Sequence, residues 1–239
     1  MTPLPDVFPQ KYESLLPFSW LAHGFVPRVP DCPATVDRAA AMELLQPLHL
    51  QVINAMGYCS ASFRTAEQVH GAHLAVVGAK SAACTSGVDG LLTNEPGLLL
   101  GIYVADCGPV YLVDPEKRAL ALVHSGKKGS ESGIAGIAVR RMQEAFGSKP
   151  EDIIVQLGPC IRYPRYEVDF PAQIRKSCLE AGVPDSQFYD CLRCTWEGAT
   201  DYYSYRREAG KTGRMLALLG IRTDVDSTGR AAGCTLPAS

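Results

Sequence analysis

Three apolar runs between residues 98 and 123 constrain the fold of this chain more than any other feature. Residues 98–105 are continuously apolar, as expected of a strand that is covered on both faces. Residues 109–113 and 119–123 predict two further strands, and the segment 114–117 between them has the composition of a turn. Neighbouring buried strands require a layered fold with a large core, which a chain of 239 residues can supply.

The remaining periodic segments mix helices with strands. Helices are predicted over 34–56, where Pro47 interrupts the pattern, and over 133–146, 171–181 and Thr212–Leu219. Strands are predicted over 74–77 and 153–157. Residues 1–33 are proline-rich and predicted to be irregular. We therefore expect an α/β (α+β) fold with mixed sheets, formed as a single domain over residues 1–239.

Composition argues against several classes of partner and compartment. A net charge of -2 gives no electrostatic reason to expect nucleic acid or an anionic membrane as partner. Lys11 and Glu13 interrupt the only apolar stretch near the start, and no apolar run is long enough to span a bilayer. Nine dispersed cysteines suit a reducing compartment, so we expect a cytoplasmic protein. Its oligomeric state is left open, and Cys191 and Cys194 are predicted to be free thiols.

Three short segments each place one metal-binding or nucleophilic side chain among small residues beside a predicted strand. They are Gln68–Gly71, Ala105–Pro109 and Val123–Gly126, which carry His70, Cys107 and His124. Side chains at the ends of neighbouring strands can converge, and two imidazoles with one thiolate form a zinc ligand set whose fourth position is open. The same residues also suit a cysteine nucleophile, Cys107, with His124 as its base. The residue types leave both alternatives open.

Further candidates lie close to these segments in the sequence. Asp106 adjoins Cys107, where it could orient an imidazole, act as an acid or base, or only bind loop amides. Lys127 and Lys128 lie in a glycine-containing loop before a helix, which suits either an anion site or a solvated loop. Arg206 could reach a substrate or pair with a surface carboxylate. His73 is predicted to point away from His70, at the surface or a pocket rim.

An ordered series of motifs resembles a known family. The series is QVHG (68–71), DGLLT (89–93), ADCGPVYLVDP (105–115), VHSG (123–126), LGP (157–159), YEV (166–168), Cys194-Thr195, Tyr203–Arg207 and Thr212–Arg214. Together these motifs resemble the laccase-domain, or polyphenol-oxidase-like, family, whose members are regarded as purine nucleoside phosphorylases with adenosine deaminase activity. The resemblance runs from about residue 64 to 221.

The resemblance implies a fold, a metal and a reaction. It implies an α/β/β/α sandwich similar to the catalytic domain of cytotoxic necrotizing factor, with zinc held by His70, Cys107 and His124. It also implies a zinc-dependent enzyme acting on adenosine, inosine or related nucleosides with phosphate. Copper is less expected than zinc, because the copper centres of a multicopper laccase need about ten histidines and this chain has five. The residues assigned to catalysis are Asp106, Cys107 and His124, and those assigned to substrate are Gln68, Lys127, Lys128 and Arg206.

The sequence departs from the family pattern in two places. The family usually continues its second histidine as His-Ala-Gly-Trp-Arg-Gly, whereas residues 124–129 here are His-Ser-Gly-Lys-Lys-Gly. Lysine keeps the positive charge but loses the bidentate geometry that arginine offers to an anion. The family's N-terminal Thr-Arg-x-Gly-Gly-x-Ser stretch has no counterpart. Two alternatives therefore stay open: a cysteine hydrolase or amidase, for example on a peptidoglycan precursor, and a non-catalytic metal-binding homologue.

Overall fold

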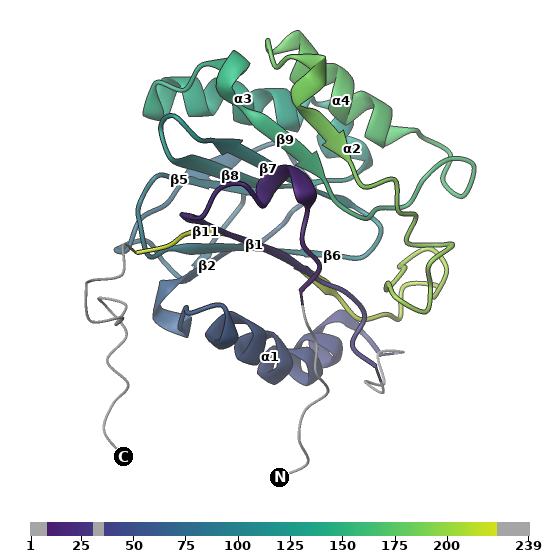
Figure 1. The fold of residues 1–239 in the computed structure, drawn as a ribbon. Helices are drawn as coiled ribbons and strands as arrows, with labels where there is room; N and C mark the ends of the chain where they lie inside the picture. Colours follow the sequence, from purple (N-terminus) through teal and green to yellow (C-terminus); the bar gives the residue numbers. More distant parts are fainter. Residues whose placement is uncertain (1–8, 31–35, 224–239) are drawn as a thin grey trace, which may run out of the picture.

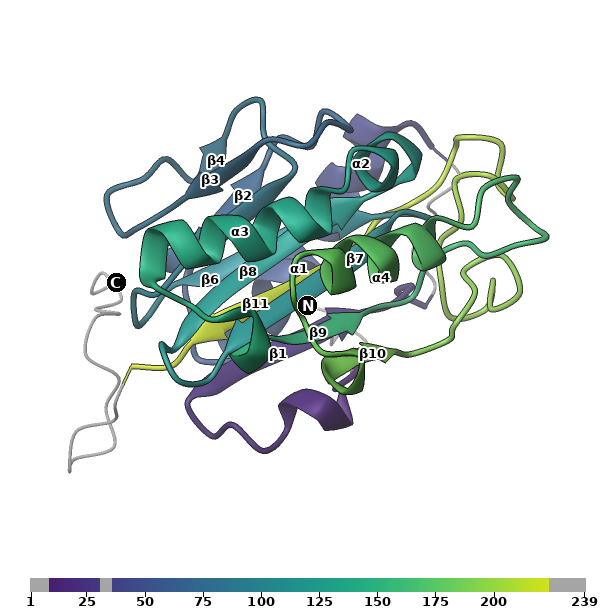
Figure 2. The same cartoon turned by 90° about the horizontal axis from the view of Figure 1, so that it is seen from above.

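Two mixed β-sheets pack face to face, with helices on both outer faces (Figure 1). The computed structural model describes residues 9–30 and 36–223. One sheet has five strands in the order β1-β11-β6-β2-β4, and the other has six in the order β10-β9-β7-β8-β5-β3. Helix α1 covers the first sheet, and α3 and α4 cover the second, as both views show (Figures 1 and 2). The predicted α/β/β/α layering with mixed sheets is confirmed.

The elements have the following bounds. The helices are α1 (Arg38–Ala55), α2 (Lys127–Glu131), α3 (Ile134–Phe146) and α4 (Phe170–Glu180), with short 3-10 helices at Glu13–Leu15, Ser60–Ser62, Pro150–Asp152 and Asp185–Gln187. The strands are β1 (Leu21–Val26), β2 (Phe63–Ala66), β3 (Leu74–Val76), β4 (Cys84–Thr85), β5 (Gly90–Thr93), β6 (Leu99–Val104), β7 (Gly108–Asp114), β8 (Ala119–Ser125), β9 (Ile154–Leu157), β10 (Phe188–Asp190) and β11 (Met215–Ile221).

Three apolar layers hold the sandwich together. One cluster lies between the sheets and includes Phe25, Leu100 and Tyr111. A second cluster joins the six-stranded sheet to α3 and α4, and a third joins the five-stranded sheet to α1. Every residue of β7 and β8 is buried, as expected of strands covered on both faces. The apolar runs at 98–105, 109–113 and 119–123 therefore form strands, as predicted.

The predicted C-terminal helix at Thr212–Leu219 is wrong. Residues Met215–Ile221 form β11, an interior strand that pairs antiparallel with β1 on one side and with β6 on the other. All seven of its residues are buried. Leucine, alanine and methionine favour a helix in isolation, but burial on both faces of a central strand outweighs that weak preference.

The N-terminal segment and the first helix also differ from expectation. Leu21–Val26 forms the fully buried strand β1, so an irregular structure over residues 1–33 is wrong for this part, while residues 1–8 and 31–33 lie outside the described structure. Helix α1 begins after Asp37, whose carboxylate caps Ala40 N–H, and continues through Pro47 to Ala55. The strands β2, β4, β5 and β10, each of two to four residues, were not predicted.

The other predicted elements are present with bounds that differ by one or two residues. Helix α3 ends at Gly147, whose φ of 68° is the left-handed value typical of a C-terminal cap. Cys191 and Cys194 are free thiols, as predicted, whereas Cys32 and Cys234 lie outside the described residues. No helix in the described part of the chain is both long enough and apolar enough to cross a bilayer.

One buried histidine on α1 has no hydrogen-bond partner in the described structure. His49 is 1% exposed, and neither ring nitrogen is bonded within the described structure. Its ring faces that of Tyr103 on β6, with centroids 5.6 Å apart. Burial lowers the pKa of His49 from 6.5 to about 4. The imidazole is therefore neutral in the folded state at neutral pH.

We expect His49→Leu to stabilise the protein and to reduce its sensitivity to acid. Between pH 6.5 and 4 the unfolded chain binds a proton at His49 that the folded chain does not, so stability falls as pH falls, by at most about 3 kcal/mol. Urea unfolding at pH 7 and pH 5 measures the difference between wild type and variant. The control is His73→Gln, which removes an exposed imidazole instead of the buried one. Equal pH dependence in wild type and His49→Leu would contradict the prediction.

Candidate metal centre

Strand pairing brings three segments together at one end of the six-stranded sheet. Strand β3 runs parallel to β5, β5 pairs antiparallel with β8, and β8 pairs antiparallel with β7. His70 precedes β3, Cys107 directly precedes β7, and His124 is the second-last residue of β8. The beginnings of β3 and β7 therefore meet the end of β8. Cys107 also lies where the chain passes from β6 in one sheet to β7 in the other.

The three predicted ligands converge. One ligand atom from each of His70, Cys107 and His124 lies within 4.8 Å of the others. The two imidazole rings stand edge to face, with centroids 4.8 Å apart. His124 is buried, Cys107 is half-buried and His70 is exposed, so the group opens to solvent on one side. Within the described residues these are the only three histidines, cysteines or acids grouped closely enough to share one metal ion.

The carboxylate of Asp89 holds the two histidine segments of this group in place by hydrogen bonds. Its Oδ1 accepts hydrogen bonds from the His70 backbone N–H at 2.8 Å and from Nδ1 of His124 at 3.0 Å, and its Oδ2 accepts from Gly71 N–H at 2.7 Å. Asp89 is fully buried. Because an ionised carboxylate only accepts, Nδ1 of His124 carries a proton, and Nε2 is the nitrogen that can bind a metal ion once it has lost its own.

Hydrogen bonds keep Asp89 ionised despite its burial. Burial alone would raise the pKa of its carboxyl, but the bonds from His124, Gly71 and His70 together lower it. Asp89 also bonds His124 through the backbone, since its carbonyl accepts from His124 N–H at 2.7 Å. One acidic residue thus fixes the position of both imidazole segments.

Left-handed backbone conformations surround the ligands. The φ angles of Gln68, His70 and Asp106 are 64°, 61° and 80°, a region that non-glycine residues rarely occupy. Each such residue costs roughly 1–3 kcal/mol and persists only where the surroundings hold it. The bonds from Asp89 hold His70 in this way. Three of the six left-handed non-glycine residues in the described structure therefore lie beside the ligands.

The Cys107 thiol and the His124 imidazole shift each other's pKa toward the charged forms. Burial would raise the pKa of Cys107, but the charge and hydrogen bonds of His124, with those of His70, lower it well below its ordinary value. Burial would lower the pKa of His124, whereas the Cys107 thiolate and Asp89 raise it. At neutral pH the pair is therefore a thiolate beside an imidazolium.

A glycine leaves room for the sulfur. A Cβ built on Gly126 would lie 2.7 Å from Cys107 Sγ, closer than packing allows. A Cβ on Gly129 would lie 3.3 Å from the carbonyl oxygen of Gly71, in the segment that carries His70. The short helix α2, which begins after Gly126, thus packs directly against two of the three ligand segments.

Two of the other predicted site residues bind the protein itself. The side chain of Gln68 donates to Tyr103 O at 2.6 Å and accepts from Tyr103 N–H at 2.9 Å, which joins its segment to β6. The carboxylate of Asp106 accepts from Thr195 Oγ1 at 2.6 Å and from Arg206 N–H at 2.7 Å. Both therefore support the loops around the ligands.

The predicted cationic residues are exposed beside the group. Lys127 and Lys128 occupy the first turn of α2. Arg206 is bonded by Asp106 through its backbone N–H, and its guanidinium pairs with Glu167 at 2.8 Å and lies over the ring of Tyr166 at 4.8 Å. His73 is exposed, as predicted, and its backbone carbonyl accepts from Asp89 N–H at 2.8 Å.

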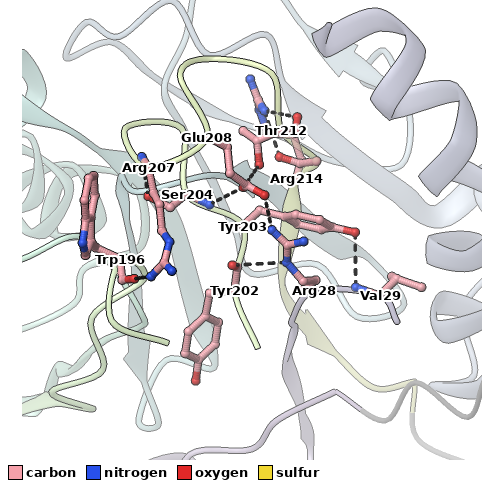
Figure 3. Close-up of polar contacts among 11 residues, drawn as sticks. Arg28, Val29, Trp196, Tyr202, Tyr203, Ser204, Arg207, Glu208, Thr212 and Arg214 are labelled. Atoms are coloured by element: carbon pink, nitrogen blue, oxygen red, sulfur yellow. Dashed lines mark hydrogen bonds and ion pairs between the residues drawn. The ribbon is translucent and has the colours of Figure 1, made fainter. Parts of the chain in front are cut away.

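A polar network holds the loop that carries Arg206 (Figure 3). Glu208 pairs with Arg28, accepts from Ser204 N–H at 3.0 Å and is bonded by Thr212. The Arg28 guanidinium lies 4.5 Å from the ring centroid of Tyr203. These contacts join the segment after β1 to the loop before β11.

Sequence reasoning missed Asp89, Arg214 and Glu208 as residues of the site or its support. Asp89 begins the motif DGLLT, and an acid directly before a short apolar strand was the available signal. Arg214 belongs to the motif Thr212–Arg214. Burial and the neighbouring guanidinium of Arg38 lower the pKa of Arg214, whereas the negative charges of Cys107 and Asp106 raise it. It therefore adds a cation near the thiolate.

Curated relatives share much of this sequence. The chain is 37% identical over 196 residues to the purine nucleoside phosphorylase YlmD of Geobacillus stearothermophilus, which covers 66% of this chain and 72% of that protein. It is 36% identical over 199 residues to the purine nucleoside phosphorylase of Deinococcus radiodurans, covering 74% of this chain and 77% of the relative.

Solved structures share the fold. The crystal structure of YlmD from Geobacillus stearothermophilus superposes with a TM-score of 0.77, covering 92% of this chain and 100% of that one; identity over this longer alignment is 28%. The Bacillus licheniformis hypothetical protein YfiH gives a TM-score of 0.77 at 23% identity, covering 84% and 93% of the two chains.

The family assignment follows from a match over most of the chain. The sequence profile described as multi-copper polyphenol oxidoreductase laccase matches residues 48–171 and 165–222. These residues include all three converging ligands and Asp89. The chain therefore belongs to this family of enzymes, which is laccase-like by description and includes relatives named purine nucleoside phosphorylases.

Proposed function

We propose that the protein is a zinc-dependent enzyme that acts on purine nucleosides, by phosphorolysis or by adenosine deamination. The observation that carries the proposal is the convergence of His70, Cys107 and His124 within 4.8 Å, with the side chain of Asp89 orienting one imidazole. The names of the relatives from Geobacillus stearothermophilus and Deinococcus radiodurans support the nucleoside substrate.

The donor set fits zinc. Two imidazole nitrogens and one thiolate are ligands that zinc accepts at about 2.0–2.3 Å, with a fourth position left for water or substrate. The exposed side of His70 leaves such a position open to solvent. When bound, zinc would supply Lewis acidity and lower the pKa of a water molecule for attack on the purine.

The number of histidines argues against a multicopper centre. Of the five histidines, His23 and His49 are buried away from the ligand group, and His73 is not part of it. His23 accepts a hydrogen bond from Tyr12 N–H, so it has a structural partner. Two imidazoles and one thiolate can serve one ion, whereas multicopper oxidases need many more histidines.

The chain's own residues would bind and orient the substrate. Lys127, Lys128, Arg206 and Arg214 provide positive charge for phosphate around the ligand group. Asp106 would act by holding the backbone of Arg206 and the side chain of Thr195 in place. Its carboxylate lies directly before Cys107 and is buried, so a role in proton transfer is a second part of this proposal.

We expect Asp89→Asn to lower zinc affinity by about 10- to 100-fold. A neutral amide orients the imidazole of His124 less firmly than a carboxylate does, and it raises the basicity of that imidazole less. Competition with a chromophoric chelator measures the affinity, and elemental analysis of protein purified without added metal gives the stoichiometry. His70→Ala should lose nearly all bound zinc. Glu116→Gln, an exposed acid on the turn between β7 and β8, is the matched control and should bind as wild type. Unchanged affinity in Asp89→Asn would refute the role of Asp89.

We expect the zinc-loaded protein to convert adenosine to inosine more readily than to adenine and ribose 1-phosphate. Lys127 and Lys128 attract phosphate as point charges, but they cannot position it as a bidentate guanidinium does. Loose positioning penalises the reaction that needs phosphate as second substrate more than the reaction that needs water. Chromatography of the products, with and without phosphate, measures the ratio. Dominant phosphate-dependent release of adenine would contradict this expectation.

A second candidate function rests on the charged thiolate–imidazolium pair. The lowered pKa of Cys107 and the raised pKa of His124 also suit a cysteine nucleophile with a histidine base, acting on an amide. In that case the metal would not be needed for turnover.

Cys107→Ser distinguishes the two functions. If Cys107 is a ligand, the variant should lose zinc affinity and nucleoside turnover together, and bound zinc should protect the wild-type thiol from alkylation. Alkylation is followed by intact mass and zinc by elemental analysis, with Cys84→Ser as the exposed-thiol control. A fully metallated but inactive Cys107→Ser, or a covalent substrate adduct on the sulfur, would support the cysteine hydrolase instead.

A further inference from the structure

Three free thiols lie near one another after strands β9 and β10. Cys160 follows β9, whereas Cys191 and Cys194 follow β10. Cys191 and Cys194 both raise the pKa of Cys160 through their charge, so the three thiols are neighbours. They do not converge as metal ligands, since within the described residues only His70, Cys107 and His124 do so. The cluster therefore suits reactions of the thiols better than metal binding.

Backbone hydrogen bonds pair two of the three cysteines, Cys160 and Cys194. Cys160 N–H donates to Arg193 O at 3.2 Å and Thr195 N–H donates to Cys160 O at 3.1 Å, which makes Cys160 and Cys194 partners in a parallel bridge. Paired strands lie about 4.8 Å apart, within the range of about 4.4–6.8 Å between Cα atoms that a disulfide needs. The bridge is isolated, so a small closing movement disturbs no ladder.

Cys191 is less well placed to pair with Cys160. Its N–H donates to Leu157 O at 3.2 Å, three positions before Cys160 along the chain, so it does not lie opposite Cys160. Cys191 also packs against the cluster between the sheets, whereas Cys160 belongs to the cluster under α3 and α4.

A cavity gives small molecules access to one member of the pair. The cavity has a volume of about 740 Å³, and Cys191, Arg193, Cys194 and Tyr202 are among its lining residues. Cys194 is half-buried, whereas Cys160 is fully buried. Burial raises the pKa of Cys160 and keeps it from external reagents. Of the pair, Cys194 is therefore the thiol that a reagent in the cavity meets first, and Cys160 is the one that can respond to it.

We propose that Cys160 and Cys194 are a reversible disulfide site that exchanges with low-molecular-weight disulfides entering this cavity. The Cys194 thiolate attacks one sulfur of the small disulfide, forming a mixed disulfide and releasing one small thiolate. Cys160 then gives its proton to the first small thiolate and attacks Cys194 Sγ, which releases the second small thiolate and forms the protein disulfide. The protein sulfurs lose two electrons and the small disulfide gains them.

The bond would fix both segments that hold Asp106. Ile161 N–H donates to Asp106 O at 2.8 Å, and Thr195 Oγ1 donates to Asp106 Oδ1 at 2.6 Å. Ile161 follows Cys160 directly, and Thr195 follows Cys194 directly. A covalent link between the two cysteines thus ties together the two supports of the residue that precedes Cys107.

Peptide mapping tests the proposal with the full-length, zinc-loaded protein and oxidised glutathione as probe. Trypsin cleaves between Cys191 and Cys194, so the cysteines fall into separate peptides: residues 142–162 carry Cys160, 177–193 carry Cys178 and Cys191, and 194–206 carry Cys194. Cys84 and Cys107 fall in 81–117 and are read separately. We expect a non-reducing digest to join 142–162 to 194–206, and a reductant to release them.

Two variants and one physical measurement complete the test. Cys160→Ser should stop at the glutathione adduct on Cys194, whereas Cys191→Ser should still form the internal bond. The oxidised wild type should melt roughly 5–10 °C above the reduced form, because the bond closes a loop of roughly 35 residues. If Cys160→Ser fails to fold, the wild-type peptide map still decides. A bond between Cys191 and Cys194, a wild-type adduct that does not resolve, or no modification would each overturn the proposal.

Discussion

The carboxylate of Asp89 is the interaction on which the site depends. It is buried where β3, β5 and β8 meet, and it accepts bonds from His70 N–H, Gly71 N–H and Nδ1 of His124. A buried carboxylate without these donors would be costly, and the left-handed turn at His70 without this acceptor would be strained. Each compensates the cost of the other. The imidazoles are therefore placed by the sheet and by one hydrogen-bonded anion before any ion binds.

The parts of the fold that the sequence could predict are those with a strong local pattern. Helix α3 has a clear apolar face and a glycine at its end, and β6, β7 and β8 are long apolar runs. The strand β11 was not predictable from its own residues, because leucine, alanine and methionine suit a buried helix equally well. Its pairing with β1 and β6 determines that this segment is a strand. Short strands such as β4 and β5 carry too few residues to show a period.

The site was predictable to the extent that its residue types are unusual. His70, Cys107 and His124 stand out because each is a metal-binding side chain that lies among small residues beside a predicted strand. Asp89 did not stand out, because acids before strands are common and its partner is 35 positions away along the chain. Gln68 and Asp106 were expected to serve chemistry, and the structure adds hydrogen bonds from both side chains to neighbouring segments, which the sequence did not reveal. Spacing in sequence does not reveal which polar groups are already paired.

The passage of the chain from β6 to β7 at Cys107 gives the ligand group a mechanical role. His70 and His124 belong to segments of the six-stranded sheet, whereas Cys107 ends the connection that leaves the five-stranded sheet. An ion held by all three would fix the end of this connection to the edge of the six-stranded sheet. Opening of the connection would then require release of the ion, so amide hydrogens near the crossover would exchange only after that release.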